Sequence, residues 1–108
     1  MSSTLIDQSA DSLLVQPAGD LIAAVLPELR TRLQQTVATG VKCLILDFSR
    51  VYMIDSAGIG LLIAAHNSMR KRGGSLSVIH ASPEIVDLFR SMGLTHHLKI
   101  AANPVEGE

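Results

Sequence analysis

The stretch of sequence that decides the fold is MIDSAGIGLL, which spans residues 53–62. The apolar run KCLILDF precedes it at 42–48, and apolar residues continue after it at helical spacing. These patterns predict a strand that turns into a helix, with Asp55, Ser56 and two glycines at the helix N-terminus. The first backbone N–H groups of a helix lack partners within the helix, and the macrodipole leaves partial positive charge there. A phosphate on Ser56 would therefore lie where the fold best accepts an anion.

Local chemistry leaves two interpretations of Ser56 open. Serine and aspartate are the residues that most often cap helices, so a purely structural cap is the more common role. The other interpretation is a switch residue that becomes phosphorylated. The Asp-Ser-x-Gly pattern does not by itself separate these two roles.

Length and composition predict one domain. The chain has 108 residues, of which 47% are hydrophobic, so it can bury a core and is not disordered. We expect the core at about 11–101 and a polar tail at 103–108. Nine basic and ten acidic residues give a net charge of −1, which argues against a protein held on nucleic acid or a membrane surface by bulk charge. The chain has no tryptophan, so stacking platforms for single strands are not expected.

The sequence also indicates the compartment. Residues 1–4 show no basic region and no apolar run of signal-peptide length. No stretch approaches the about 20 apolar residues that span a bilayer. The single cysteine, Cys43, has no partner for an internal disulfide and lies in a strand pattern, which predicts a buried, inert thiol. We therefore expect a cytoplasmic protein that does not insert into a membrane.

No group of residues is sufficient for catalysis. Ser56, Asp87 and either His96 or His97 follow the chain order of an α/β-hydrolase triad. The nucleophile elbow of that class requires glycine two residues before the serine, and Ile54 stands there. The four histidines are scattered, without a cysteine or carboxylate at metal-ligand spacing. The glycines after Ser56 form no complete nucleotide loop, and there is no Walker lysine. The sequence predicts a protein that is not an enzyme and holds neither metal nor cofactor.

Strand and helix patterns alternate along the chain. The continuous apolar run at 42–48 predicts a central strand that is covered on both faces. The order of elements predicts a single α/β domain, with a mixed central sheet of four to five strands packed with three or more helices. The expected strands are 12–17, paired with 4–8, then 42–48, 75–80 and 95–101. The expected helices are 24–38, 56–72 and one opened by Ser82 and Pro83, with a buried stripe of Ile85, Leu88, Phe89 and Met92.

The helix at 56–72 is apolar on nearly all sides in its first half. One face carries Ile59 and Leu62, and another carries Leu61 and Ala64 at the same spacing. Such a helix is either buried on both sides or leaves one face for a partner. The second alternative makes Leu61 a candidate partner contact.

The whole pattern resembles the STAS family, which includes anti-sigma factor antagonists and sulfate-transporter-type domains. The resemblance runs from about Leu13 to Ile100. Its main anchor is LILDFS at 44–49, which leads into VYMIDSAGIGLL at 51–62. The other anchors are Gly19-Asp20-Leu21, Gly73-Gly74 before a strand, Pro83-Glu84, Leu88-Phe89 and Gly93-Leu94.

The resemblance implies a bacterial partner-switching protein, an anti-sigma factor antagonist. In that family the serine directly after the motif aspartate, which is Ser56 here, is phosphorylated by an anti-sigma factor that is itself a serine kinase. The unphosphorylated antagonist binds the kinase and releases the sigma factor, and a serine phosphatase resets it. A homodimer is left open. The residues expected to contact the partner are Asp20, Asp55, Ser56, Ala57, Gly58 and Leu61.

Two positions depart from the usual family pattern. Many antagonists have an acidic residue where this chain has Ile22, which bears on recognition by a sigma-regulating kinase. Many also have a second serine where this chain has Ala57, and its absence removes one ambiguity about the acceptor. The alternative function is a non-phosphorylated STAS scaffold or interaction subunit, as in stressosome-like or lipid-transport-associated members. In that alternative Ser56 only caps a helix.

Overall fold

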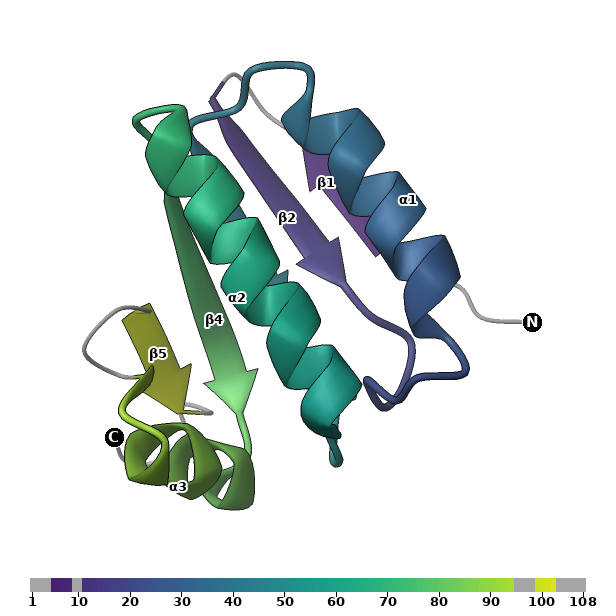
Figure 1. Cartoon of the computed structure of the whole chain (residues 1–108), viewed down its shortest axis with the longest axis vertical. Coiled ribbons are helices and arrows are strands. Elements are labelled where there is room, and N and C mark those ends of the chain that lie inside the picture. The colour runs from purple at the N-terminus through teal and green to yellow at the C-terminus, as the bar shows by residue number, and fades with distance from the viewer. Residues whose placement is uncertain (1–4, 9–10, 95–98, 103–108) are drawn as a thin grey trace.

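The computed structural model describes residues 5–8, 11–94 and 99–102. In these residues a pair of strands is followed by alternating helices and strands, as the sequence predicts (Figure 1). Most element boundaries lie within two residues of the expected ones. The expected last strand begins in residues outside the described part, and its described portion is Lys99–Ala102. In chain order the elements are β1 Leu5–Gln8, β2 Ser12–Gln16, α1 Leu26–Val37, β3 Cys43–Asp47, α2 Ser56–Lys71, β4 Ser75–Ala81, α3 Pro83–Ser91 and β5 Lys99–Ala102.

The strands form one mixed sheet in the order β1-β2-β3-β4-β5. β1 pairs antiparallel with β2, with Ile6 opposite Val15. The other pairs are parallel, and Leu44 of β3 lies opposite Leu13 of β2 and Leu76 of β4. The expected mixed α/β sheet with three helices is therefore confirmed.

The helices α1 and α2 lie side by side over the same face of the sheet (Figure 1). Each belongs to a crossover between adjacent parallel strands, and right-handed crossovers that advance in one direction across a sheet place their helices on one face. The strands therefore bury every second side chain beneath these helices. The buried strand residues include Leu13, Val15, Leu44, Leu46, Leu76 and Val78.

The expectation that 42–48 is covered on both faces is wrong. Along β3 buried and half-buried residues alternate: Leu44 and Leu46 face the helices, whereas Ile45 is half-buried on the other face. Cys43, expected as a buried thiol, shares that second face and is half-buried as well. The apolar run reflects the hydrophobicity of β3 and not helices on both sides of it.

The helix α3 begins as expected. Ser82 is its N-cap, because the side-chain oxygen accepts a hydrogen bond from the N–H of Ile85, and Pro83 follows in the first turn. Phe89 is buried and meets Phe48 edge to face, with ring centroids 6.4 Å apart. The prediction that Leu88 and Met92 are also buried is wrong, because these side chains are 37% and 50% exposed. This short helix buries only a narrow face, which contains Ile85 and Phe89.

Candidate functional site

Two loops meet at the N-terminus of α2. The loop that follows β2 and the loop that follows β3 join through a parallel bridge between Leu21 and Ile54. The N–H of Leu21 donates to the carbonyl of Met53 at 3.0 Å, and the N–H of Asp55 donates to the carbonyl of Leu21 at 3.1 Å. Leu21 itself is 2% exposed and anchors this junction in the core. The sequence motif at 53–62 is thereby fixed beside the Gly19-Asp20-Leu21 segment.

Asp20 strengthens the same junction. Its Oδ1 accepts hydrogen bonds from the backbone N–H groups of Tyr52, at 2.8 Å, and of Met53, at 3.0 Å. We expected Asp20 to contact a partner. The structure gives it a local task, which is to hold the loop before α2 in one conformation.

Asp55 is the N-cap of α2. Its backbone is extended, with φ −97° and ψ −177°, and its Oδ1 accepts from the N–H of Gly58 at 2.9 Å. Its Oδ2 accepts from the N–H of Ala23 in the other loop at 3.0 Å. The hydrogen bonds from Gly58 and then Ala23 hold the pKa of the Asp55 carboxyl below its ordinary value. The carboxylate therefore keeps its negative charge beside the next residue.

Ser56 is the first residue of α2 and not its cap. The interpretation of Ser56 as a helix cap is therefore wrong, because Asp55 occupies that position. Ser56 and Ala57 are both exposed. Within the described part of the chain, no hydrogen bond engages the Ser56 hydroxyl. The site thus presents an accessible hydroxyl at a helix N-terminus, next to an ionised carboxylate.

Two residues that we expected at a partner surface are buried. Gly58 packs so closely on the loop after β2 that a Cβ at this position would lie 2.5 Å from the carbonyl oxygen of Leu21. Leu61 is 5% exposed and belongs to the core. The expectation that Leu61 is an exposed partner contact is therefore wrong. Only the Leu61 end of this face is buried, because Ala64 and Ser68 on the same face are exposed.

The exposed apolar residues of this region come from the loops instead. Tyr52 is 71% exposed and Met53 is 64% exposed, while Ile22 and Val25 are 38% exposed each. Val25, Tyr52 and Met53 were not expected as site residues, and Ile22 was expected only as a departure from a family pattern. Their signal was a run of apolar residues between a strand and a helix, which periodicity assigns to the core. We call Ile22, Val25, Tyr52 and Met53 the loop patch.

A second polar cluster lies at the end of β3. His80 Nδ1 is 3.1 Å from Asp47 Oδ1, and Gln16 Nε2 donates to Asp47 Oδ2 at 3.3 Å and to Ser49 Oγ at 2.9 Å. Partial burial opposes ionisation of Asp47, but hydrogen bonds from Ser49 and His80 outweigh it and lower its pKa. Among the described residues the Ser49 hydroxyl has no bond to a histidine, so the cluster lacks a nucleophile–base pair. It connects β2, β3 and β4 at one end of the sheet.

In residues 5–8, 11–94 and 99–102, no three His, Cys, Asp or Glu side chains gather closely enough to hold a metal ion. In those ranges, too, no helix has the length and apolar character needed to cross a bilayer.

Comparison with known proteins identifies the class to which this fold and site belong. The model of the STAS domain family matches residues 4–107, so the chain belongs to the STAS domain family. The anti-sigma-B factor antagonist of Listeria monocytogenes is 28% identical over 109 residues, which cover 100% of this chain and 93% of that protein.

Solved structures show the same fold. The crystal structure of an anti-sigma factor antagonist from Mycobacterium paratuberculosis superposes with a TM-score of 0.81 at 22% identity, and the match covers 94% of this chain and 86% of that one. The phosphorylated form of SpoIIAA, a Bacillus cell fate determinant, gives a TM-score of 0.73 at 19% identity, with 93% and 92% of the two chains covered.

Proposed function

We propose that the chain is an anti-sigma factor antagonist that binds an anti-sigma serine kinase and is switched off by phosphorylation of Ser56. The observation that carries the proposal is the exposed Ser56 hydroxyl at the first position of α2, directly after the capping carboxylate of Asp55. Two further lines support it: the similarity to anti-sigma factor antagonists, and the solved phosphorylated form of a protein with this fold.

The loop patch supplies a docking surface for the kinase. Exposed aromatic and long apolar side chains, such as those of Tyr52 and Met53, are typical anchors of protein interfaces. The hydrogen bonds that the backbone N–H groups of both residues donate to Asp20 hold their loop in place before binding. A preorganised surface loses less conformational entropy when a partner docks. The roles expected for Asp20 and Asp55 in partner binding thus become roles in presenting this surface.

Phosphorylation of Ser56 would change this surface without breaking the fold. A phosphate adds a charge of about −1.5 to −2 at neutral pH. The N-terminus of α2 favours that charge, so the domain tolerates it. A docked partner, however, would have to desolvate the phosphate together with the ionised Asp55 next to apolar side chains, which costs binding energy. The modified protein therefore releases its partner.

The kinase provides the chemistry of this switch. Transfer of a phosphoryl group requires a nucleotide, a divalent metal and a group that orients the attacking hydroxyl. In the proposed pathway the kinase supplies all three, and a serine phosphatase reverses the modification. This chain supplies only the acceptor hydroxyl and the surface that presents it.

The alternative is a STAS scaffold in which Ser56 is never modified. One observation favours it: Ile22, where many antagonists carry an acidic residue, is an exposed part of the loop patch. Because Asp55 caps α2, the scaffold alternative leaves Ser56 with no capping role and makes it an ordinary surface residue.

The two functions are separated by mapping the phosphate. The full chain is incubated with Mg-ATP and an anti-sigma serine kinase from the same genome, and the modified residue is identified by mass spectrometry. We expect phosphate on Ser56 and none in the Ser56→Ala variant. Ser68→Ala, which removes another exposed hydroxyl of α2, is the matched control and should be modified like the parent. Phosphate on Ser49 or Ser68, or on no residue, would contradict the proposal.

A further inference from the structure

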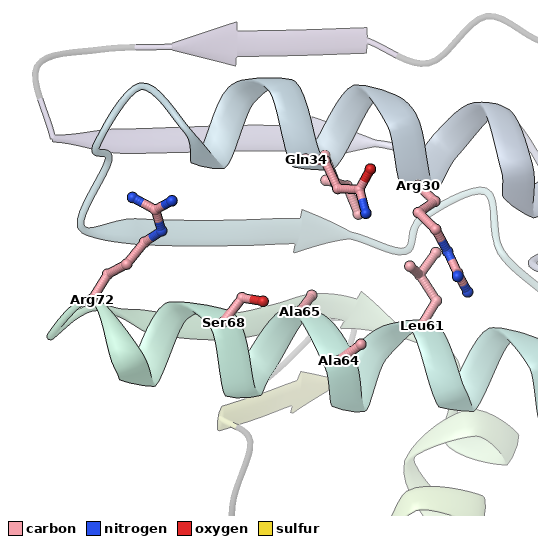
Figure 2. A pocket seen from close by; sticks show the side chains of 8 residues that line it. Arg30, Gln34, Leu61, Ala64, Ala65, Ser68 and Arg72 are labelled. Atoms are coloured by element: carbon pink, nitrogen blue, oxygen red, sulfur yellow. The ribbon is translucent and has the colours of Figure 1, made fainter.

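A groove runs between α1 and α2 (Figure 2). It follows α2 from Leu61 to Arg72, so it begins more than one turn after Ser56. Its volume is about 340 Å³. The buried side chains of Leu33 and Leu61 contribute its apolar floor, and Ala64 and Ala65 line it from α2. The groove exists because α2 presents small side chains toward α1, so the two helices do not fill the space between them.

The two ends of the groove carry positive charge. Arg30 lies at one end, level with Leu61, and Arg72 lies at the other (Figure 2). Among the described residues that line the groove none is acidic, and the α2 sequence contains no acidic residue at all. The lining therefore favours an anionic occupant.

Two of the other four arginines have carboxylate partners in the described part of the chain. Arg90 lies 3.1 Å from Asp87, and Arg32 lies 3.8 Å from Glu28 on the outer part of α1. Among the residues that the structure describes, neither Arg30 nor Arg72 pairs with a carboxylate. Both guanidinium groups are thus left for acidic groups from another molecule, and a guanidinium can bind a carboxylate through two hydrogen bonds.

We propose that this groove docks an amphipathic helix of a partner protein, through aliphatic side chains on its floor and two acidic side chains on Arg30 and Arg72. A furrow between two neighbouring helices is a common seat for a third helix. The presence of a cation at both ends argues for a helix over a fatty acyl chain, because an acyl chain carries charge at one end only. The surface is separate from Ser56 and goes beyond the proposed antagonist function.

The spacing of the two arginines defines the partner motif. From the level of Leu61 to Arg72, α2 advances about three turns, or about 16 Å along its axis. On a partner helix that lies alongside, residues about 11 positions apart span the same length and return to the same face. The motif is therefore two acidic residues about three turns apart, with small or aliphatic residues at helical spacing between them.

The test uses a synthetic helix as the probe. A fluorescein-labelled amphipathic peptide of about five turns carries two glutamates at this spacing on its apolar face, and a matched peptide carries lysines there. Fluorescence anisotropy with the full chain should show binding of the glutamate probe, with the lysine probe weaker by at least about tenfold. Arg30→Glu and Arg72→Glu should each lower the affinity for the glutamate probe by about tenfold. The double variant should prefer the lysine probe.

The control variant is Arg70→Glu. It makes the same charge change at the same end of α2, but Arg70 lines a different surface with Ile63 and Met92. Its affinity for the glutamate probe should stay within about twofold of the parent. Ala64→Trp fills the groove from an exposed position and should abolish binding at an unchanged melting temperature. If that variant unfolds, Ser68→Trp fills the groove from a second exposed position and should likewise abolish binding.

Several outcomes would overturn the proposal. They are failure of the glutamate probe to bind, equal binding of both probes, insensitivity to the two arginine reversals, and displacement of the probe by palmitate with the same arginine dependence. The last outcome would assign the groove to an acyl ligand. The assay involves neither Ser56 nor a kinase, so its failure leaves the proposed function untouched.

Discussion

Asp55 and Ala23 are joined by a 3.0 Å hydrogen bond from the backbone N–H of Ala23 to Oδ2 of Asp55, across 32 positions of sequence. The other oxygen of the same carboxylate caps α2 through the N–H of Gly58. One side chain therefore fixes both the start of the helix and the loop that precedes α1. The position of Ser56 depends on these two hydrogen bonds to Asp55.

Replacement of Asp55 tests that dependence. Asp55→Ala removes both hydrogen bonds and should lower the melting temperature more than any substitution of Ser56 does. Asp55→Asn keeps an oxygen for the Gly58 N–H, but its amide nitrogen cannot accept from Ala23, so its loss should be intermediate. Thermal unfolding followed by circular dichroism gives this order directly. Equal melting temperatures for Asp55→Ala and Ser56→Ala would contradict it.

The lowered pKa of Asp55 predicts how the free energy of unfolding falls at acid pH. Hydrogen bonds from Gly58 and Ala23 hold this pKa below 3.8, the ordinary value, so the unfolded chain takes up the proton first as pH falls. The stabilisation is complete above pH 3.8 and is lost as pH falls through the lower folded-state value. Denaturant midpoints between neutral pH and about pH 3 should therefore fall more steeply for the parent than for Asp55→Asn. Asp47, whose pKa is also lowered, contributes equally in both proteins. Identical pH profiles would refute the assignment.

The fold was predictable from the sequence because its determinants are local and periodic. Apolar alternation and helical spacing placed the strands and helices, and Pro83 after Ser82 marked the start of α3. Which faces are covered was not predictable, because that depends on the handedness and position of the crossovers. A continuous apolar run at 42–48 looks the same whether helices lie on one face of the sheet or on both.

The site was predictable only in part. The motif located Ser56, but the sequence could not decide which of two adjacent capping residues forms the cap. Asp55 forms the cap because its backbone is extended and because its carboxylate also accepts a hydrogen bond from the N–H of Ala23. Leu61 was misplaced because its helical face is equally apolar whether it meets α1 or a partner. The loop patch was missed because loop residues such as Tyr52 and Met53 have no periodicity that would show their exposure.

The contact between Gly58 and Leu21 predicts an asymmetry between two glycines of α2. A methyl group on Gly58 would meet the carbonyl oxygen of Leu21 at 2.5 Å, so Gly58→Ala should destabilise the domain by about 1–3 kcal/mol. Gly60 has no such neighbour within 4 Å, and Gly60→Ala should stabilise it by about 0.5–1 kcal/mol through helix propensity. Urea denaturation of both variants measures the difference. A Gly58→Ala protein as stable as the parent would show that the two loops are not packed as described.

The loop patch predicts which apolar residues bind the kinase. Tyr52→Ala and Met53→Ala should each lower the affinity for the kinase by about tenfold, or about 1.4 kcal/mol, because both side chains are largely exposed and free to be buried by a partner. Met92→Ala is the matched control, since Met92 is half exposed at the C-cap of α3, where it lies beside Ile63 and Arg70 and away from the loops. Isothermal titration calorimetry on the three variants compares them. An equal loss from Met92→Ala would move the interface away from the N-terminus of α2.

Substitution of Ser56 separates the switch from the scaffold. Ser56→Asp introduces part of the charge of a phosphate, whereas Ser56→Ala removes the acceptor and leaves a neutral surface. Because Asp55 is the cap, both variants should keep the unfolding free energy of the parent within about 0.5 kcal/mol. Their affinities for the kinase should differ: Ser56→Asp should bind more weakly than the parent, since its carboxylate adds to that of Asp55 beside the loop patch. Ser56→Ala should bind like the unmodified protein and remain bound after incubation with Mg-ATP, which should release the parent.

Affinity and thermal stability are measured on the same three proteins, so a loss of binding cannot be mistaken for unfolding. Equal affinity of all three proteins, before and after ATP, would exclude the phosphorylation switch and leave the scaffold function.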